Sequence, residues 1–175
     1  MEPGDVGDTA RGEQVRAALT WPDQYGDNSG APPAILLEVI VEFSTKVAAP
    51  ENLACACIAV GVFQAQKLSA AARSLDRAAG GRIRSVLQSG DMDGKVGTTR
   101  ILYDVPGVLA KRVRLVGMGG DAKVNAKDYR DAARAAVAAI LDTGAVDVCL
   151  HLVGISVSGR DATWKARQLA LAASD

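Results

Sequence analysis

Apolar positions recur from residue 36 onward with two different periods, and together they predict a sheet covered by helices. Stretches in which apolar residues run together or alternate with polar ones predict strands over 36–46, 53–63, 101–105, 112–116 and 146–153. Apolar residues three or four positions apart predict helices over 68–79, 83–88, 125–141 and 160–173. Because strands and helices mix without strict alternation, we expect an α/β fold of three layers, with a mixed β-sheet and helices on both faces.

The first 40 residues differ from the rest of the chain in composition. They are rich in Gly, Pro, Asp and Asn, and a short helix is suggested only over 13–19. They carry seven acidic and two basic side chains, a net charge of −5, whereas residues 41–175 carry thirteen acidic and eighteen basic ones, a net charge of +5. We therefore expect a flexible acidic leader over 1–40 and a folded domain over 41–175. Two alternatives stay open: Trp21 and Tyr25 dock on the domain, or the product begins near Val41.

Composition argues against several classes of protein. Aromatic residues make up only 4% of the chain, which disfavours a base-stacking platform for nucleic acids. No run of about 18 apolar residues predicts a transmembrane helix, and the acidic first residues lack the apolar core of a secretory signal. The cysteines lie inside apolar runs, and together with the missing signal they favour free thiols in the cytoplasm. We expect no membrane partner.

Four potential metal ligands stand in two pairs, with one residue between the members of each pair: Cys55, Cys57, Cys149 and His151. Side chains two positions apart on a strand share a face but lie about 6.6 Å apart along it. Zinc ligands must converge on one atom at roughly 2.0–2.3 Å. We therefore interpret the four as buried core residues. Asp91 and Asp93 lie in a polar loop and are interpreted as part of a solvated turn.

A glycine turn follows the predicted strand 112–116 and resembles a dinucleotide-binding motif. Gly117, Gly119 and Ala122 fit the G-x-G-x-x-A spacing of that motif, with Gly120 as a further glycine of the turn, and Asp142 follows about twenty positions later. The motif requires a helix that begins within it, so that the helix N-terminus holds the pyrophosphate. Here the helix is expected only from Asn125. We interpret the glycines as a tight turn and keep nucleotide binding as the alternative.

Lys111, Arg112 and Arg114 form a small basic cluster. The two arginines alternate with apolar residues, which predicts an edge strand or a strand with one solvated face. Contact of these three cations with DNA phosphates, or with another anionic partner, is the alternative.

Three stretches are specific enough to suggest a family: DMDGKVGT at 91–98, VPGVLAKRVRLVGMG at 105–119 and WKARQ at 164–168. With flanking residues over about 42–175, they resemble the N-terminal domain of bacterial leucyl aminopeptidases, in the cytosol aminopeptidase family, peptidase family M17. The resemblance implies a macro-like fold. It implies a parent enzyme that acts in proteolysis as a hexameric hydrolase and removes N-terminal residues from peptides with two divalent metals, manganese or zinc.

The resemblance assigns those metals, and the catalytic Lys and Arg, to a larger C-terminal domain whose N-T-D-A-E-G-R signature is not in this sequence. It therefore implies no catalytic, metal or cofactor residue here, and we expect a fragment or a natural truncation. The implied role is to support the structure and hexamer of the enzyme beside its catalytic domain. In some members DNA contact is implied too, with the basic cluster as the candidate. The alternative is a free-standing macro-like module that binds a nucleotide or ADP-ribose.

Overall fold

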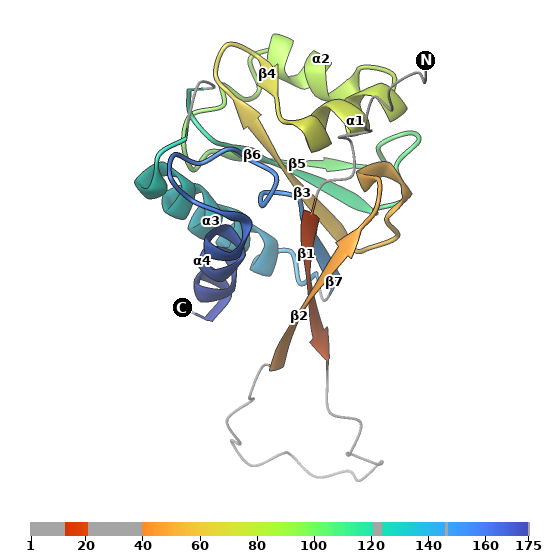
Figure 1. Ribbon diagram of the computed structural model, residues 1–175. Helices are drawn as coiled ribbons and strands as arrows, with labels where there is room; N and C mark the ends of the chain where they lie inside the picture. Colours follow the sequence, from red (N-terminus) through yellow and green to blue (C-terminus); the bar gives the residue numbers. More distant parts are fainter. Residues whose placement is uncertain (1–12, 21–39, 121–123, 146, 175) are drawn as a thin grey trace, which may run out of the picture.

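Strands of the described chain form one mixed sheet of seven members (Figure 1). The computed structural model describes residues 13–20, 40–120, 124–145 and 147–174. The strands are β1 (Glu13–Thr20), β2 (Ile40–Val47), β3 (Cys57–Phe63), β4 (Lys67–Leu68), β5 (Thr99–Tyr103), β6 (Arg112–Gly117) and β7 (Asp147–Leu150). Their order is β2-β1-β7-β3-β6-β5, and β4 pairs with the end of β3. The central strands β7, β3 and β6 are parallel, and the other pairings are antiparallel.

Two pairs of helices cover opposite faces of this sheet and confirm the predicted three layers. Helices α1 (Ala70–Ala78) and α2 (Arg82–Gln88) lie on one face, and α3 (Ala126–Leu141) and α4 (Ala162–Ser174) on the other. Alternate side chains of β3 enter different cores, because successive residues of a strand point to opposite sides. Ile58 and Val60 pack with α1 and α2, whereas Cys57 and Ala59 pack with α3 and α4. This double burial explains the nearly continuous apolar run of β3.

Local signals set the helix ends where the sequence predicts them. The Ser69 hydroxyl accepts a hydrogen bond from the backbone N–H of Ala72 at 3.2 Å, so it caps α1. The Asn125 side chain accepts from the Asp128 N–H at 2.8 Å and caps α3 in the same way. Gly144 follows α3 with φ of +63°, a conformation that glycine adopts without steric cost.

Two expectations about single elements are wrong. The short helix suggested over 13–19 is strand β1, which pairs with β2 on one side and with β7 on the other. Pairing with two neighbours supplies backbone hydrogen bonds that a local propensity does not register. Most of the expected leader, residues 1–12 and 21–39 with Trp21 and Tyr25, lies outside the described residues. Its last residue, Ile40, begins β2. The predicted edge strand around Arg112 is β6, which lies inside the sheet between β3 and β5.

Candidate functional site

The carboxyl ends of the parallel strands β3 and β6 carry a loop of residues 91–98, here named the strand-end loop. Its backbone is hydrogen-bonded to the residues that end β6. The Gly119 N–H donates to the Gly94 carbonyl at 2.9 Å, the Gly97 N–H donates to the Gly117 carbonyl at 3.1 Å, and the Gly117 N–H donates to the Thr98 carbonyl at 2.8 Å. The loop therefore continues the hydrogen bonding of the sheet beyond the last paired residue of the strand.

Glycine is required at two contacts of this loop because backbone meets backbone there. A Cβ placed on Gly94 would lie 2.5 Å from the carbonyl carbon of Phe63 and 2.7 Å from the Gln64 nitrogen. A Cβ on Gly117 would collide with the Lys95 carbonyl oxygen. The sequence motif at 91–98 thus encodes a close approach of three backbone segments.

The charged residues of the strand-end loop face solvent, as predicted. The Lys95 ammonium lies 2.7 Å from a carboxylate oxygen of Asp93, and hydrogen bonds from Lys95 lower the pKa of Asp93. Asp91 accepts from the Ser89 hydroxyl at 3.0 Å and lies 3.8 Å from Arg100. These side chains pair with their own neighbours in an exposed turn and do not form a joint carboxylate site.

The strand-end loop occupies the position where open α/β sheets commonly bind ligands. Such sites lie outside the carboxyl ends of neighbouring strands whose connections leave for opposite faces. Here β3 continues to α1 on one face and β6 continues to α3 on the other. The backbone N–H groups of Gly117 and Gly119 already donate to the loop, so they do not point at a free anion site. Nucleotide or ADP-ribose binding at this turn gains no support from these two N–H groups and stays a prediction.

Asp142 does not complete a dinucleotide site. It is the C-cap of α3, a helix of 16 residues that begins near the glycine turn. The helix carries Asp142 roughly 24 Å away from its first turn, because each residue adds about 1.5 Å along the axis. Gly120 is exposed, and a Cβ there would meet no atom within 4 Å. The spacing read from the sequence therefore brings the acid to the wrong end of the domain.

The basic cluster divides between surface and core. Lys111 is exposed, Arg112 is half-buried, and Arg114 is only 8% exposed. The Arg114 guanidinium donates to the Ala139 carbonyl at 2.7 Å, and an Arg112 nitrogen donates to the Thr143 carbonyl at 3.5 Å. The last carbonyls of a helix lack partners within the helix, so the two arginines stabilise the C-terminal end of α3.

This placement removes Arg114 from the surface that a phosphate contact requires, and only Lys111 is fully exposed. The burial of Arg114 could not be predicted from the sequence, because the alternation of charged and apolar residues in β6 is also the pattern of a half-solvated strand. DNA contact by the cluster stays a prediction.

The cysteines and the histidine do not converge on one point. Cys57 packs on the α3 and α4 side of the sheet, whereas Cys55 and Cys149 pack on the α1 and α2 side. A hydrogen bond with Cys149 and burial raise the pKa of the Cys55 thiol, and burial raises that of Cys57. Burial lowers the pKa of His151 to about 4, so this imidazole is neutral near neutral pH. The four are core residues, as interpreted from the strand spacing.

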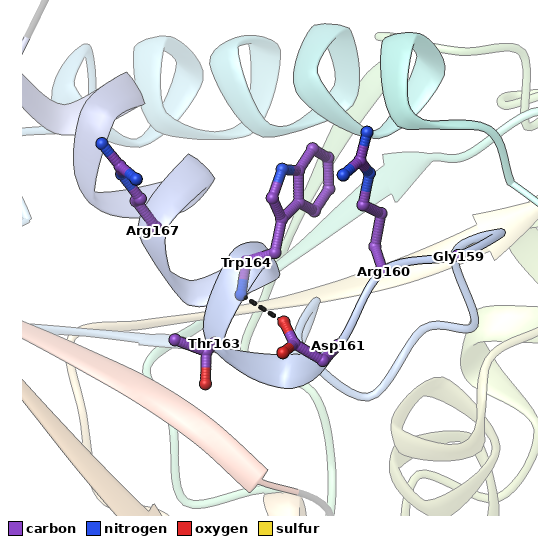
Figure 2. A pocket seen from close by; sticks show the side chains of 6 residues that line it. All are labelled: Gly159, Arg160, Asp161, Thr163, Trp164 and Arg167. Atoms are coloured by element: carbon purple, nitrogen blue, oxygen red, sulfur yellow. Dashed lines mark hydrogen bonds between the residues drawn. The ribbon is translucent and has the colours of Figure 1, made fainter.

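An open hollow lies at the start of α4, where the sequence predicts no site. Its volume is about 640 Å³, and its lining consists of Gly159, Arg160, Asp161, Thr163, Trp164 and Arg167 (Figure 2). The guanidinium carbon of Arg160 lies 5.1 Å from the centre of the Trp164 ring, and Tyr129 of α3 packs against that ring with 5.7 Å between ring centres. The one available signal was the W-K-A-R-Q motif, which places Trp164 and Arg167 three positions apart on one helix face.

Comparison with known proteins identifies the family. A sequence profile described as "Cytosol aminopeptidase family, N-terminal domain" matches residues 59–175. The chain belongs to the cytosol aminopeptidase family. It is 44% identical over 131 residues to the "Probable cytosol aminopeptidase" of Nitrosospira multiformis, and 40% identical over 135 residues to that of Dechloromonas aromatica. These alignments cover 75% and 77% of this chain but 25% and 27% of the relatives, so the chain spans about a quarter of their length.

Solved structures agree with the macro-like fold expected for this part of a cytosol aminopeptidase. The macrodomain of Thermus aquaticus DarG superposes with a TM-score of 0.58 at 10% identity, covering 73% of this chain and 87% of that one. A mutant of tomato leucine aminopeptidase superposes with a TM-score of 0.52 at 22% identity, covering 74% of this chain and 26% of that one. At these identities the likeness concerns the fold alone.

The described residues of this chain do not fit the two divalent metals that the family resemblance implies. Within the described ranges, no three or more His, Cys, Asp or Glu side chains are grouped so that they could hold a metal ion. Cys55, Cys57 and Cys149, the thiols considered from the sequence, are divided between the two faces of the sheet and are buried. We therefore derive no chemical step through a metal in this domain.

In the described part of the chain, no helix has the length and apolar character of a membrane crossing.

Proposed function

We propose that this chain is a structural module of a metal-dependent aminopeptidase and supports the fold and assembly of the enzyme without binding substrate itself. The observation that carries the proposal is the strand-end loop. Gly94, Gly117 and Gly119 join it to β6 by backbone hydrogen bonds at the place where a sheet of this kind would otherwise receive a ligand. The strand-end loop thus occupies, by hydrogen bonds within the domain, the end of the sheet at which a ligand would bind.

The side chains with potential chemistry support the same role. Arg114 stabilises the end of a helix, and its guanidinium is directed at a backbone carbonyl. The three thiols are buried, and the pKa values of Cys55 and Cys57 are raised, which disfavours the reactive thiolate. His151 is buried and its low pKa suits a neutral core residue. Each of these groups serves packing or hydrogen bonding within the domain.

Assembly requires surfaces that other parts of an enzyme can cover, and the described residues offer several. Four large apolar side chains are about half exposed or more: Tyr103, Leu109, Leu141 and Leu171. Tyr103 pairs across the strands with Arg112, whose side chain reaches Thr143 just beyond Leu141. Exposed apolar and aromatic side chains of this kind are typical of protein contacts. The parent would act in the cytoplasm, as the names of the relatives suggest.

A chimera tests the proposal. The matching quarter of the Nitrosospira multiformis relative is replaced by this chain, and hydrolysis of leucine p-nitroanilide with Mn²⁺ is measured together with the molecular mass by light scattering. We expect the chimera to hydrolyse the substrate and to have the mass of its parent. We expect this chain alone to show no hydrolysis, and the relative without its first quarter to lose the assembled mass.

A matched pair of variants separates contact surface from general destabilisation. Tyr103→Ser with Leu141→Ser should weaken assembly of the chimera, whereas Arg73→Ser with Arg77→Ser, also exposed, should not. Hydrolysis by this chain alone would overturn the proposal. So would a relative that assembles and works equally well without this domain.

A further inference from the structure

We propose that the hollow at the start of α4 is a docking site for an acidic segment of a protein partner, with Arg160 and Arg167 as the groups that bind its carboxylates. Both arginines are exposed and line the same hollow. Within the described residues, neither has a carboxylate within ion-pair distance. Some basic side chains do pair with an acid nearby, namely Arg84, Lys95, Arg100, Lys127 and Arg134. Arg73 and Arg77 on α1 also form no ion pair within the described residues, and Arg160 and Arg167 differ from them because they line one hollow. Two unpaired guanidinium groups facing one hollow favour an anionic occupant.

Trp164 holds this site in shape. Its ring is partly buried against the core between the sheet and helices α3 and α4. The ring contacts the Tyr129 ring and also the Arg160 guanidinium. The contact of a cation with the face of an indole restrains the arginine while its N–H groups stay available. The Asp161 carboxylate also lines the hollow, so the three charged side chains leave a net charge of about one positive unit there. Asp161 accepts from the backbone N–H of Trp164 at 2.8 Å and caps α4, and it lies beyond ion-pair distance of both arginines. A side chain that is restrained before binding loses less entropy on binding.

The backbone beneath the hollow is anchored as well. The Ser158 N–H donates to the Val124 carbonyl at 3.0 Å, next to the first turn of α3, and the Arg160 N–H donates to the Val157 carbonyl at 3.2 Å. The segment that carries Arg160 is thus tied to the start of α3, and α3 packs along α4. The beginnings of both helices lie at this place, and their dipoles add positive potential to that of the arginines.

The chemistry of the surface favours a protein over a nucleic acid. The indole is already packed by Arg160 and Tyr129, so it is not a free platform for a base. The exposed stripe of α4 continues from Arg167 to Leu171, four residues further on, and Leu171 is 49% exposed. Trp and Arg are also the residue types that contribute most to binding at protein interfaces. An apolar side chain beside the acids of the partner would cover Leu171.

Arg160 lies two residues before α4 and Arg167 lies five residues after its first residue, with Trp164 between them (Figure 2). An extended segment with acidic residues at every second position repeats its carboxylates about every 6.6 Å on one side. Such a segment presents a carboxylate to each arginine in one register or another, so it is the form chosen for the test.

The test uses a fluorescein-labelled peptide in which glutamate alternates with threonine, and the same peptide with glutamine in place of glutamate. Binding to the full chain is followed by fluorescence anisotropy at low and moderate salt. We expect the glutamate peptide to bind, the glutamine peptide to bind at least about tenfold more weakly, and salt to weaken the binding. Arg160→Gln with Arg167→Gln should weaken it by about tenfold, the scale of one charge-assisted hydrogen bond.

The control removes two positive charges elsewhere. Arg73 and Arg77 lie on α1, on the opposite face of the sheet, and both are exposed. Arg73→Gln with Arg77→Gln lowers the net charge by the same amount and should leave the affinity unchanged. Leu171→Ser should weaken binding of a glutamate peptide that carries leucine at one end, and should not affect one without it.

Three results would overturn the proposal: no binding of the glutamate peptide at low salt, equal weakening by both arginine pairs, or tighter binding of a labelled DNA duplex with the same dependence on Arg160 and Arg167. Circular dichroism checks that each variant is folded, and the single variants Arg160→Gln and Arg167→Gln replace the double variant if it is not. Each single variant should then weaken binding by about threefold or more, half of the tenfold effect in free energy.

Discussion

Gly94 lies against the backbone of Phe63 so closely that a Cβ on it would stand 2.5 Å from the Phe63 carbonyl carbon. Its φ of +73° is also a conformation that other residues adopt at a cost. This contact joins the strand-end loop to the last residue of β3, while the Gly94 carbonyl accepts from Gly119 after β6. One glycine therefore links two strand ends.

Gly94→Ala should destabilise the domain by about 3 kcal/mol, from positive φ and overpacking together. Gly90→Ala is the matched control, because its φ of +81° is similar but a Cβ there meets nothing within 4 Å. It should cost about 1–2 kcal/mol. Urea unfolding followed by circular dichroism measures both. Equal losses would show that the contact with Phe63 is unimportant.

Arg114→Met should destabilise the domain by about 2 kcal/mol, because it leaves the Ala139 carbonyl without its charged donor. Methionine keeps much of the length and apolar volume of the side chain, so packing changes little. Lys111→Met, on the exposed neighbour, should change the stability by less than about 0.5 kcal/mol. The midpoint of thermal or urea unfolding compares the two. A larger effect of the Lys111 substitution would contradict the assignment of Arg114 to the helix end.

Stability should fall as the pH falls through the range in which His151 is titrated. The folded-state pKa is about 4, below the value of about 6.5 expected in an unfolded chain. The unfolded chain therefore binds a proton between these pH values that the folded chain does not, and acid favours unfolding. The contribution amounts to about 3 kcal/mol once the pH is below 4.

His151→Leu isolates this effect, since His151 is the one histidine of the sequence and the carboxyl groups are the same in both proteins. The difference in unfolding free energy between the wild-type chain and the variant should change by about 3 kcal/mol from pH 7 to pH 4, with the wild type losing more. Parallel curves for the two proteins would show that His151 is accessible to protons in the folded state.

The turn between β3 and β4 should be improvable. Ala65 and Gln66 have φ of +55° and +59°, which matches a turn that prefers Asn followed by Gly. Ala65→Asn with Gln66→Gly should stabilise the domain by about 1 kcal/mol. Ala138→Gly, an exposed position within α3, should instead cost about 1 kcal/mol. Destabilisation by the turn variant in urea unfolding would argue against the left-handed conformation of these residues.

The thiols should react only when the domain opens. Cys55, Cys57 and Cys149 are at most 6% exposed, and the pKa values of Cys55 and Cys57 are raised. At pH 8, modification by Ellman's reagent should be slow in the folded chain and immediate in urea. The rate should increase in Gly94→Ala in proportion to its population of unfolded molecules. Rapid reaction of the folded wild type would contradict the burial of these residues.

Sequence alone was sufficient for the elements with strong local signals. The caps at Ser69 and Asn125 and the glycines after α1 and α3 placed the helices, because a cap satisfies backbone groups of its own helix. The apolar run of β3 indicated burial on both faces. The motifs at 91–98 and 164–168 suggested the family, and the comparisons confirm it.

Tertiary structure alone decided how these residues are used. The charged alternation in β6 is the same whether Arg114 faces water or the end of α3, and only the packing of α3 on the sheet distinguishes the two. The glycines of the strand-end loop and those of the nucleotide-like turn lie in separate sequence motifs. Only the fold shows that the two motifs are hydrogen-bonded to each other, through Gly94 with Gly119 and Gly97 with Gly117. A strand over 13–20 likewise depends on partners at 40–47 and 147–150. The physical reason is common to all three: a local pattern specifies conformation and polarity, whereas the partner of a hydrogen bond or of a side chain comes from a distant part of the chain.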